Sequence, residues 1–444
     1  MHNHTSVDIP RSTVILLFLH YGKITVVNFA NPVMIDQNLV LRDKEAVKRS
    51  LSRKGYDVSN IDKLEEALVA QKKLKTELDE LRAKRNRWNK DREISVKDKR
   101  ALRDEIAEKE KLLADYDAVC RDLLYDIPNF PDDDAPEGLD ESGNVVIAEC
   151  EDYYKCAVDT PRPHWEIGKE LGILDIEAAT KISGAMFALY KGKGSQLLRA
   201  LVSYGLKLHG EKYLEVTPPH VVSSKTLTYT GHLPKFSEEQ YKAINDDLWL
   251  IHTAEVPLTG CFANETFQQG ELPQYRCGYT VCFRREAGSA GKDTRGLQRI
   301  HEFHKVELVK VVEPSMKDIE LQDLLKDCLR IIQDLKLQYR IVDLCTGDMG
   351  DKYGRCYDIE VYAPGVQRWL EVSSVGHFSD YQARRANIKF VNADGKREVA
   401  YTLNGSGIAT PRVLAAIIET YQQPDGSVIV PEVLRPYIGT DVIR

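Results

Sequence analysis

Four segments of the chain carry polar or aromatic residues an even number of positions apart, the spacing that places side chains on one face of a β-strand. The pairs are Thr253 with Glu255, Arg284 with Glu286, Phe303 with Glu307, and Glu371 with Ser373, with Ser374 just beyond. A single pair of this kind is explained by the solvated face of a strand. Four in one region predict a shared sheet surface that carries carboxylates, an arginine, an aromatic ring and hydroxyls.

These residue types suit the binding of a nucleotide together with a small zwitterion. A permanently charged guanidinium such as that of Arg284 makes bidentate contacts to phosphate or carboxylate. Phe303 can stack on a base, and Glu371 can hold Mg²⁺ that bridges phosphates. The loop GSAGKDTRG would then bring Lys292 and Arg295 over a triphosphate, with its glycines allowing closure.

The elements that must position these residues differ along the chain. From about residue 150 onward, strand-like alternation and helical segments interleave without the regularity of βαβ units, which favours an α+β domain with a largely antiparallel sheet. Residues 61–125 instead carry apolar residues at alternating spacings of three and four, typical of a coiled-coil seam. The seam fades between Lys90 and Lys97. We predict an antiparallel helical hairpin with its tip there, each helix being about 30 residues and about 45 Å long.

The predicted tip is strongly basic. Between Arg82 and Arg103, ten lysines and arginines face three acids, a local charge of +7 in a chain whose net charge is −7. Charge runs are most often solvated helix faces, but this cluster ends a protruding arm and includes Trp88, which favours contact with a polyanion such as an RNA backbone. The residues expected to make that contact are Lys84, Arg85, Arg87, Lys90, Arg92, Lys97, Lys99 and Arg100.

Composition suggests four parts. We predict an extension of uncertain status at 1–33, a helical arm domain at 34–130, a linker at 131–150 and a catalytic domain at 151–444. The extension holds the apolar run VILLFL, too short to span a bilayer; we interpret it as a dispensable or mis-assigned segment, with a targeting segment as the alternative. The nine cysteines contain no CxxC pair, so neither a zinc site nor a disulfide framework is expected.

From about Met34 to its C-terminus, the chain resembles the seryl-tRNA synthetases, a family of class II aminoacyl-tRNA synthetases. The resemblance rests on the blocks TAEVPLTG, FRREAGSAGKDTRGL, HKVELV, WLEVSS, QARRANI and LNGSGIATPR in this order. It implies an antiparallel-sheet class II catalytic domain with an N-terminal antiparallel coiled-coil arm. It also implies ATP-dependent ligation of L-serine to tRNA(Ser) through a seryl-adenylate, with Mg²⁺ accompanying ATP, and serylation of tRNA(Sec) where that tRNA is present. A cytoplasmic homodimer without membrane association is expected, with an organelle as the alternative location.

The resemblance also implies a role for individual residues. The serine pocket would contain Thr253, Ala254, Glu255, Arg284, Glu307, Asn404 and Ser406. ATP would contact Arg284, Arg285, Glu286, Ile300, His301, Glu302, Phe303, Glu371, Val372, Ser373, Ser374 and Arg412, with Glu286 at the adenine edge, Phe303 beneath the ring and Arg412 above it. Catalysis would rest on Arg284, Glu371 and Arg412, Mg²⁺ would be held by Glu371 and Ser374, and Pro219 would lie in the dimer interface. Arg285, which stands where FRSE is commoner, should face away from the site.

One triplet departs from the family pattern. After EVSS the family usually continues with a Cys-Ser-Asn-type triplet, whereas this chain has Val375, Gly376 and His377, a change that bears on the shape of the pocket. Two other interpretations compete with the resemblance. A non-catalytic, RNA-binding paralogue should have lost charged residues such as Glu255 and Arg412, and an enzyme that loads amino acids onto a carrier protein should lack the arm. The chain has Glu255, Arg412 and the arm, which disfavours both of these interpretations.

Overall fold

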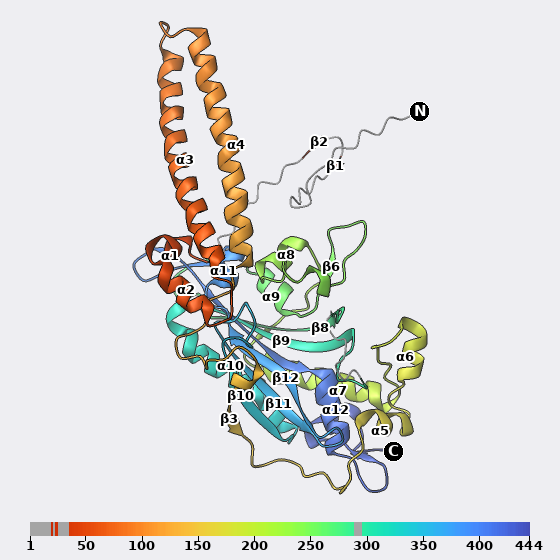
Figure 1. The fold of residues 1–444 in the computed structure, drawn as a ribbon. Helices are drawn as coiled ribbons and strands as arrows, with labels where there is room; N and C mark the ends of the chain where they lie inside the picture. The colour runs from red at the N-terminus through yellow and green to blue at the C-terminus, as the bar shows by residue number, and fades with distance from the viewer. Residues whose placement is uncertain (1–18, 21–22, 25–34, 288–294) are drawn as a thin grey trace, which may run out of the picture. The chain divides into compact units, whose positions relative to one another are not determined.

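The computed structural model describes residues 19–20, 23–24, 35–287 and 295–444 (Figure 1). The chain divides into two compact units, 1–32 and 33–444. The first contributes the short antiparallel pair β1 (Leu19–His20) and β2 (Lys23–Ile24). Most of the predicted extension, and Lys292 of the predicted closing loop, lie outside the described residues. All that follows concerns the second unit.

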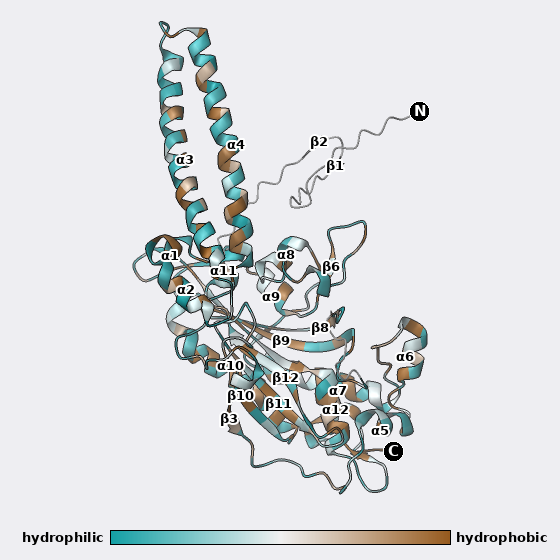
Figure 2. Ribbon diagram, in the orientation of Figure 1, coloured by the Kyte–Doolittle hydropathy of each residue, from teal (hydrophilic) through white to brown (hydrophobic). Residues whose placement is uncertain are grey.

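The basic arm is an antiparallel helical hairpin, as predicted. Helix α3 (Ser59–Lys90) runs outward and α4 (Val96–Asp126) returns, so the tip falls where the apolar seam fades (Figure 1). Figure 2 shows hydrophobic residues recurring along otherwise hydrophilic helices. Leu64 and Leu78 of α3 and Leu102 and Ile106 of α4 are almost fully buried. Helices α1 (Gln37–Arg42) and α2 (Lys44–Ser52) pack with the start of α3 in a separate small core.

A serine cap starts the returning helix of the hairpin. The Ser95 hydroxyl accepts a hydrogen bond from the Asp98 N–H at 3.1 Å and donates one to the Asp98 carboxylate at 2.6 Å. Such a side chain satisfies one of the four N–H groups that a helix start leaves without an intrahelical partner.

We therefore expect Ser95→Ala to lower the local stability of the tip by about 1 kcal/mol. Hydrogen exchange of the first amides of α4 measures this. The control is Thr76→Ala, because the Thr76 hydroxyl bonds back to the Lys72 carbonyl inside α3 and alanine is a better helix former. If the exchange rates of the α4 amides in Ser95→Ala match those of the wild type, the cap does not stabilise the tip.

The part of the chain after the arm is built on an eight-stranded sheet in the order β3-β10-β11-β12-β15-β9-β8-β4. Its strands are β3 (Val145–Glu149), β4 (Leu214–Glu215), β8 (Gln274–Phe283), β9 (Glu302–Val312), β10 (Tyr339–Asp343), β11 (Arg355–Ala363), β12 (Arg368–His377) and β15 (Tyr401–Ala409). Neighbouring strands are antiparallel except β4 and β8, which are parallel. The predicted α+β class with a largely antiparallel sheet is confirmed. Part of the segment predicted as a linker, 131–150, is the edge strand β3.

Three helices cover one face of the sheet: α7 (Lys193–Gly210), α10 (Lys317–Asp334) and α12 (Thr410–Thr420). Their apolar sides share one large core with alternate residues of the strands, such as Val306 and Leu308 of β9. Because side chains alternate along a strand, Phe303, Lys305 and Glu307 point to the opposite face. That face carries the site. None of the helices in the described ranges is long and apolar enough to cross a membrane.

The remaining elements are short. They are α5 (His164–Glu170), α6 (Ile176–Ser183), α8 (Ser224–Tyr229), α9 (Glu255–Gly260), α11 (Tyr381–Ala386), α13 (Arg435–Ile438), β5 (Val221–Val222), β6 (Trp249–Leu250), β7 (Thr266–Phe267), β13 (Lys389–Val391), β14 (Arg397–Val399), β16 (Val428–Ile429) and β17 (Val442–Ile443). Helices α8, α9 and α11 contact one another near the site face. Helices α9 and α11 supply buried polar residues to it, among them Glu255 and Gln382.

Candidate active site

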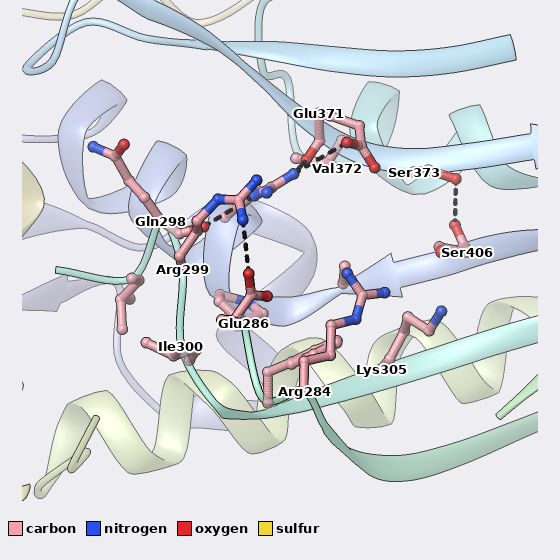
Figure 3. Close-up of a pocket in the computed structure, with 15 residues that line it drawn as sticks. Arg284, Glu286, Gln298, Arg299, Ile300, Lys305, Glu371, Val372, Ser373 and Ser406 are labelled. Carbon is pink, nitrogen blue, oxygen red and sulfur yellow. Dashed lines mark hydrogen bonds and ion pairs between the residues drawn. The ribbon is translucent and has the colours of Figure 1, made fainter. Parts of the chain in front are cut away.

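A cavity opens on this face of the sheet (Figure 3). Its lining includes many of the predicted nucleotide contacts: Arg284, Glu286, Ile300, Phe303, Glu371, Val372, Ser373 and Arg412. It also includes Ser406, which was predicted for the serine pocket. Phe303 comes from β9, Glu371 from β12, Ser406 from β15 and Arg412 from α12. Four elements distant in sequence therefore converge on one space.

Two of the four expected strand pairs are not on strands. Strand β8 ends at Phe283, and Glu286 has a left-handed backbone with φ of 50°. Glu255 is the first residue of α9, and β6 ends at Leu250. The chain turns after β8, and Arg284 and Glu286 nevertheless both line the cavity. Alternation along a strand was therefore the wrong basis for these two pairs, and it holds for Phe303 and Glu307 on β9. Glu371 and Ser373 both lie on β12, but a β-bulge separates them, and the hydroxyl that bonds to Glu371 is that of Ser374.

Arginines dominate the charge around the cavity. The Arg284 side chain extends into it (Figure 3). The Arg284 guanidinium lies 5.1 Å from the centre of the Phe303 ring. Arg299 pairs with the Glu286 carboxylate at 2.7 Å. Arg412 donates to the backbone carbonyls of Glu371 at 2.7 Å and Gln298 at 3.2 Å. Three guanidinium groups and one apolar ring in the lining of the same cavity suit a polyphosphate attached to an aromatic base.

Two carboxylates, those of Glu371 and Asp358, lie near Ser374 on the neighbouring strands β12 and β11. The Ser374 hydroxyl donates to Glu371 Oε1 at 3.1 Å, and Asp358 lies opposite Ser374 in the β11–β12 register. Asp358 Oδ1 is buried without a hydrogen-bond partner among the described residues. Burial, and then the charge of Glu371, raise the pKa of Asp358 well above its ordinary value. Burial acts in the same direction on Glu371, but Arg412 and Arg284 outweigh it and lower the Glu371 pKa.

This oxygen cluster fits a hard divalent cation. Mg²⁺ takes one or two carboxylates and completes its coordination with water and substrate phosphates. An orphaned carboxylate oxygen beside an ionised carboxylate and a hydroxyl is a donor set of that kind. Asp358 was not predicted. It faces Ser374 only through strand register, which the sequence does not display.

A buried polar cluster adjoins the cavity and contains the predicted serine contacts. Thr253 donates to Glu307 at 3.1 Å, and Asn404 donates to Glu307 at 2.8 Å and to Glu255 at 3.1 Å. Lys305, which also lines the cavity, donates to Thr253 at 2.8 Å and forms an ion pair with Glu307. Glu307 is fully buried, and burial raises its pKa although Lys305 opposes the effect. Ser406 pairs with Glu307 in the β15–β9 register.

Some predicted ATP contacts do not line the cavity. Arg285 is exposed and donates instead to the Glu238 carbonyl at 3.1 Å, which corrects its place in the nucleotide set and agrees with the expectation that it faces away. His301 donates through Nδ1 to the Arg284 carbonyl at 2.9 Å. Glu302 and Ser374 also lie outside the lining. Ala254 is fully buried in the core next to α9.

Sequence reasoning also missed residues that contribute to the site. Gln298, Arg299 and Lys305 line the cavity, and Lys352 and Gln382 bond to Glu255. Lys305 lies two residues from both Phe303 and Glu307, so the alternation already used would have found it. The others reach the site through folding of distant segments, for which spacing gives no signal.

The remaining predicted residues lie away from the cavity. At the arm tip Arg87, Lys90, Arg92, Lys97 and Arg100 are exposed, while Lys84, Arg85 and Lys99 are half-buried. Lys84 lies over the Trp88 ring at 4.5 Å, and Lys99 donates to the Asp91 carbonyl. Pro219 is exposed in the segment between β4 and β5.

An antiparallel sheet that gathers arginines, carboxylates and an aromatic ring on one face is the core of a class II aminoacyl-tRNA synthetase. Residues 236–421 match the family model described as the tRNA synthetase class II core domain (G, H, P, S and T), and residues 34–131 match the seryl-tRNA synthetase N-terminal domain. The chain is 42% identical over 419 residues to the serine--tRNA ligase of Dehalococcoides mccartyi, covering 93% of this chain and 100% of that one. It is 44% identical over 429 residues to the serine--tRNA ligase of Thermodesulfovibrio yellowstonii, with the same coverage. The chain belongs to the seryl-tRNA synthetase family.

Solved structures agree. A seryl-tRNA synthetase from Pyrococcus horikoshii complexed with ATP is similar with a TM-score of 0.85 and 31% identity, over 92% of this chain and 99% of that one. A cytoplasmic serine-tRNA ligase from Naegleria fowleri in complex with AMP is similar with a TM-score of 0.84 and 26% identity, over 93% and 99%. The predicted family and enzyme class are confirmed: the protein is a class II enzyme that ligates serine to tRNA.

Proposed function

We propose that ligation proceeds through a seryl-adenylate made from ATP and serine in the cavity described above. The observation that supports this most directly is the convergence of Arg284, Arg412 and Glu371 on one space beside the buried cluster around Glu307. A triphosphate and an amino acid bound there would have their reacting atoms next to each other.

The first step needs no proton acceptor. The serine carboxylate has a free pKa of about 3.3–3.7 and is ionised at neutral pH. One of its oxygens attacks the α-phosphorus of ATP, the bond to the bridging oxygen breaks, and pyrophosphate leaves with the electron pair. Arg284 is placed to neutralise charge that develops on the α-phosphate, so alignment and electrostatic stabilisation supply the catalysis.

We assign the nucleotide contacts as follows. Phe303 stacks beneath adenine, Glu286 accepts from its exocyclic amine, and Arg412 covers the ring from the other side. Glu371, Ser374 and Asp358 would hold Mg²⁺, which when bound withdraws charge from the phosphates. In the second step a ribose hydroxyl at the tRNA 3′ end attacks the seryl carbonyl carbon, and AMP leaves.

Serine is selected by a pocket that hydrogen-bonds its hydroxyl and its ammonium. Glu307 and Ser406 are placed for the hydroxyl, and Thr253 and Glu255 for the ammonium. A site built for a hydroxyl leaves its own buried groups unpaired when alanine enters, a discrimination of order 10⁴–10⁵. Threonine is excluded by the added methyl group.

Glu307→Gln is therefore expected to raise KM for serine by about 10- to 100-fold. Glutamine has nearly the same shape as glutamate but lacks the charge of the buried acceptor. The KM for ATP should change little. Glu313→Gln, just beyond β9, is the matched control and should leave both constants unchanged. An unaltered serine KM in Glu307→Gln would show that serine does not contact this residue.

Four finer assignments rest on the resemblance to the family. The arm contacts tRNA(Ser) with its basic tip, and tRNA(Sec) is serylated where present. Two copies associate through the surface around Pro219, where Leu214 and Val221 are 65% and 43% exposed; equilibrium sedimentation tests the dimer. We place the enzyme in the cytoplasm, with an organelle as the alternative.

Serine-dependent exchange of labelled pyrophosphate into ATP tests the proposed function. We expect exchange with serine and none with alanine or threonine at the same concentration. Absence of exchange with serine, in protein that is folded and binds tRNA, would contradict the adenylate route and favour a non-catalytic relative.

A further inference from the structure

One loop of the catalytic domain is hydrogen-bonded along its backbone to the N-terminal part of the chain. The segment 350–354 lies between β10 and β11, and the Lys54 ammonium donates to its Gly350 carbonyl at 2.8 Å and its Tyr353 carbonyl at 2.6 Å. Lys54 also donates to the Asp351 carbonyl at 3.4 Å. Three further bonds are from Asn129 N–H to Asp351 O at 2.8 Å, from the Asn129 amide to Lys352 O at 2.9 Å, and from Asp132 N–H to Gly354 O at 2.9 Å. Five consecutive carbonyls thus accept from residues that precede the catalytic sheet.

This loop carries Lys352, whose ammonium reaches the buried polar cluster. It lies 3.1 and 3.2 Å from the two carboxylate oxygens of Glu255 and 2.8 Å from His232 Nε2. An ammonium only donates, so His232 Nε2 accepts and Nδ1 carries the proton, which it donates to Thr230 at 2.8 Å. Burial, and then the charge of Lys352, lower the pKa of His232, which fits a neutral ring.

Glu255 connects Lys352 to the groups assigned to serine. Its two oxygens also accept from Gln382 at 2.6 Å and Asn404 at 3.1 Å, and Asn404 donates in turn to Glu307 at 2.8 Å. The Glu255 side chain is 4% exposed and forms an ion pair with Lys352. Removing one partner of a buried ion pair leaves the other charge uncompensated, so Glu255 would move or take up a proton.

We propose that Lys352 is a positioning residue for the serine pocket and that Lys54 and Asn129 of the N-terminal domain, together with Asp132 of the segment that follows it, hold it in place. The inference rests on the proposed placement of Glu255 in that pocket. The N-terminal domain then sets serine affinity even without tRNA, which is a role separate from any contact made at the arm tip.

The test compares two lysines of the N-terminal domain in pyrophosphate exchange without tRNA. Lys54→Met is expected to raise KM for serine about tenfold while KM for ATP stays within about twofold of the wild type. The matched control is Lys48→Met in α2, because the Lys48 ammonium pairs at 2.7 Å with Asp62 inside the N-terminal domain. It should change neither constant.

A double-mutant cycle separates positioning from general stability. Lys352→Met should raise serine KM at least as much as Lys54→Met, and adding Lys54→Met to it should have little further effect, because sites that act through one contact are not additive. If Lys54→Met does not fold, Asn129→Ala removes the donor to the Lys352 carbonyl and takes its place with the same expected result.

The outcomes are distinct. A wild-type serine KM in a folded Lys54→Met protein, or fully additive effects in the cycle, overturns this inference alone. Absence of serine-dependent exchange in the wild type overturns the proposed function, and this inference with it.

Discussion

Replacing Arg284 with alanine is expected to lower the rate of serine-dependent pyrophosphate exchange by about 10³-fold. Arg284 extends into the cavity between Glu286 and Lys305 (Figure 3). Arg284 is the only arginine that we assign to the α-phosphate. The loss of Arg284 should therefore destabilise the transition state of the reaction rather than the fold. The loss should fall mainly on kcat, because the interaction strengthens as charge develops.

The neighbouring arginine supplies the matched control. Arg285→Ala deletes the same type of side chain from the next position, but Arg285 is exposed and bonds to Glu238 outside the cavity. We expect exchange within about twofold of the wild type. Comparable rates in the Arg284 and Arg285 variants would refute the role given to Arg284.

Neutralising the arm tip is expected to separate the two reactions of the enzyme. A variant with glutamine at all eight predicted tRNA contacts should charge tRNA about 10³-fold more slowly at physiological salt, because a neutral side chain at a phosphate releases no counterion. The eight residues are Lys84, Arg85, Arg87, Lys90, Arg92, Lys97, Lys99 and Arg100. Pyrophosphate exchange should be unchanged, since the tip does not line the cavity.

Salt dependence identifies the cause of the weaker charging. The wild-type tRNA affinity should fall steeply with salt concentration and the neutralised variant should respond less, with a slope reduced by roughly one for each cation that no longer meets a phosphate. Lys72→Gln with Lys73→Gln, on the same arm below the tip, is the control and should charge normally. Undiminished charging by the tip variant would remove tRNA binding from the role of the arm.

The sequence predicted those parts of the fold that depend on local periodicity. The hairpin followed from the seam through Leu64, Leu78 and Leu102, and its tip from the fading of that seam. The alternation of Phe303 and Glu307 on β9 placed both on the site face because a long central strand leaves little freedom.

Other parts depended on geometry that spacing does not record. Glu286 reaches the cavity through a left-handed turn after β8, and Glu255 through the first turn of α9, so both were placed in the site by the wrong argument. Lys352 and Asp358 come to the site through the pairing of β10, β11 and β12, which are contacts between distant segments. Such residues can be recognised only once the sheet is built.

The bonding of the 350–354 carbonyls to Lys54, Asn129 and Asp132 has a consequence for protein engineering. Separate family models match the arm domain and the core, but hydrogen bonds join the two, so we do not expect one to be exchanged without affecting the other. A chimera that joins a relative's arm to this core must therefore also take the relative's segment that corresponds to 350–354. Without it, a graft intended to alter tRNA preference would also weaken amino-acid activation.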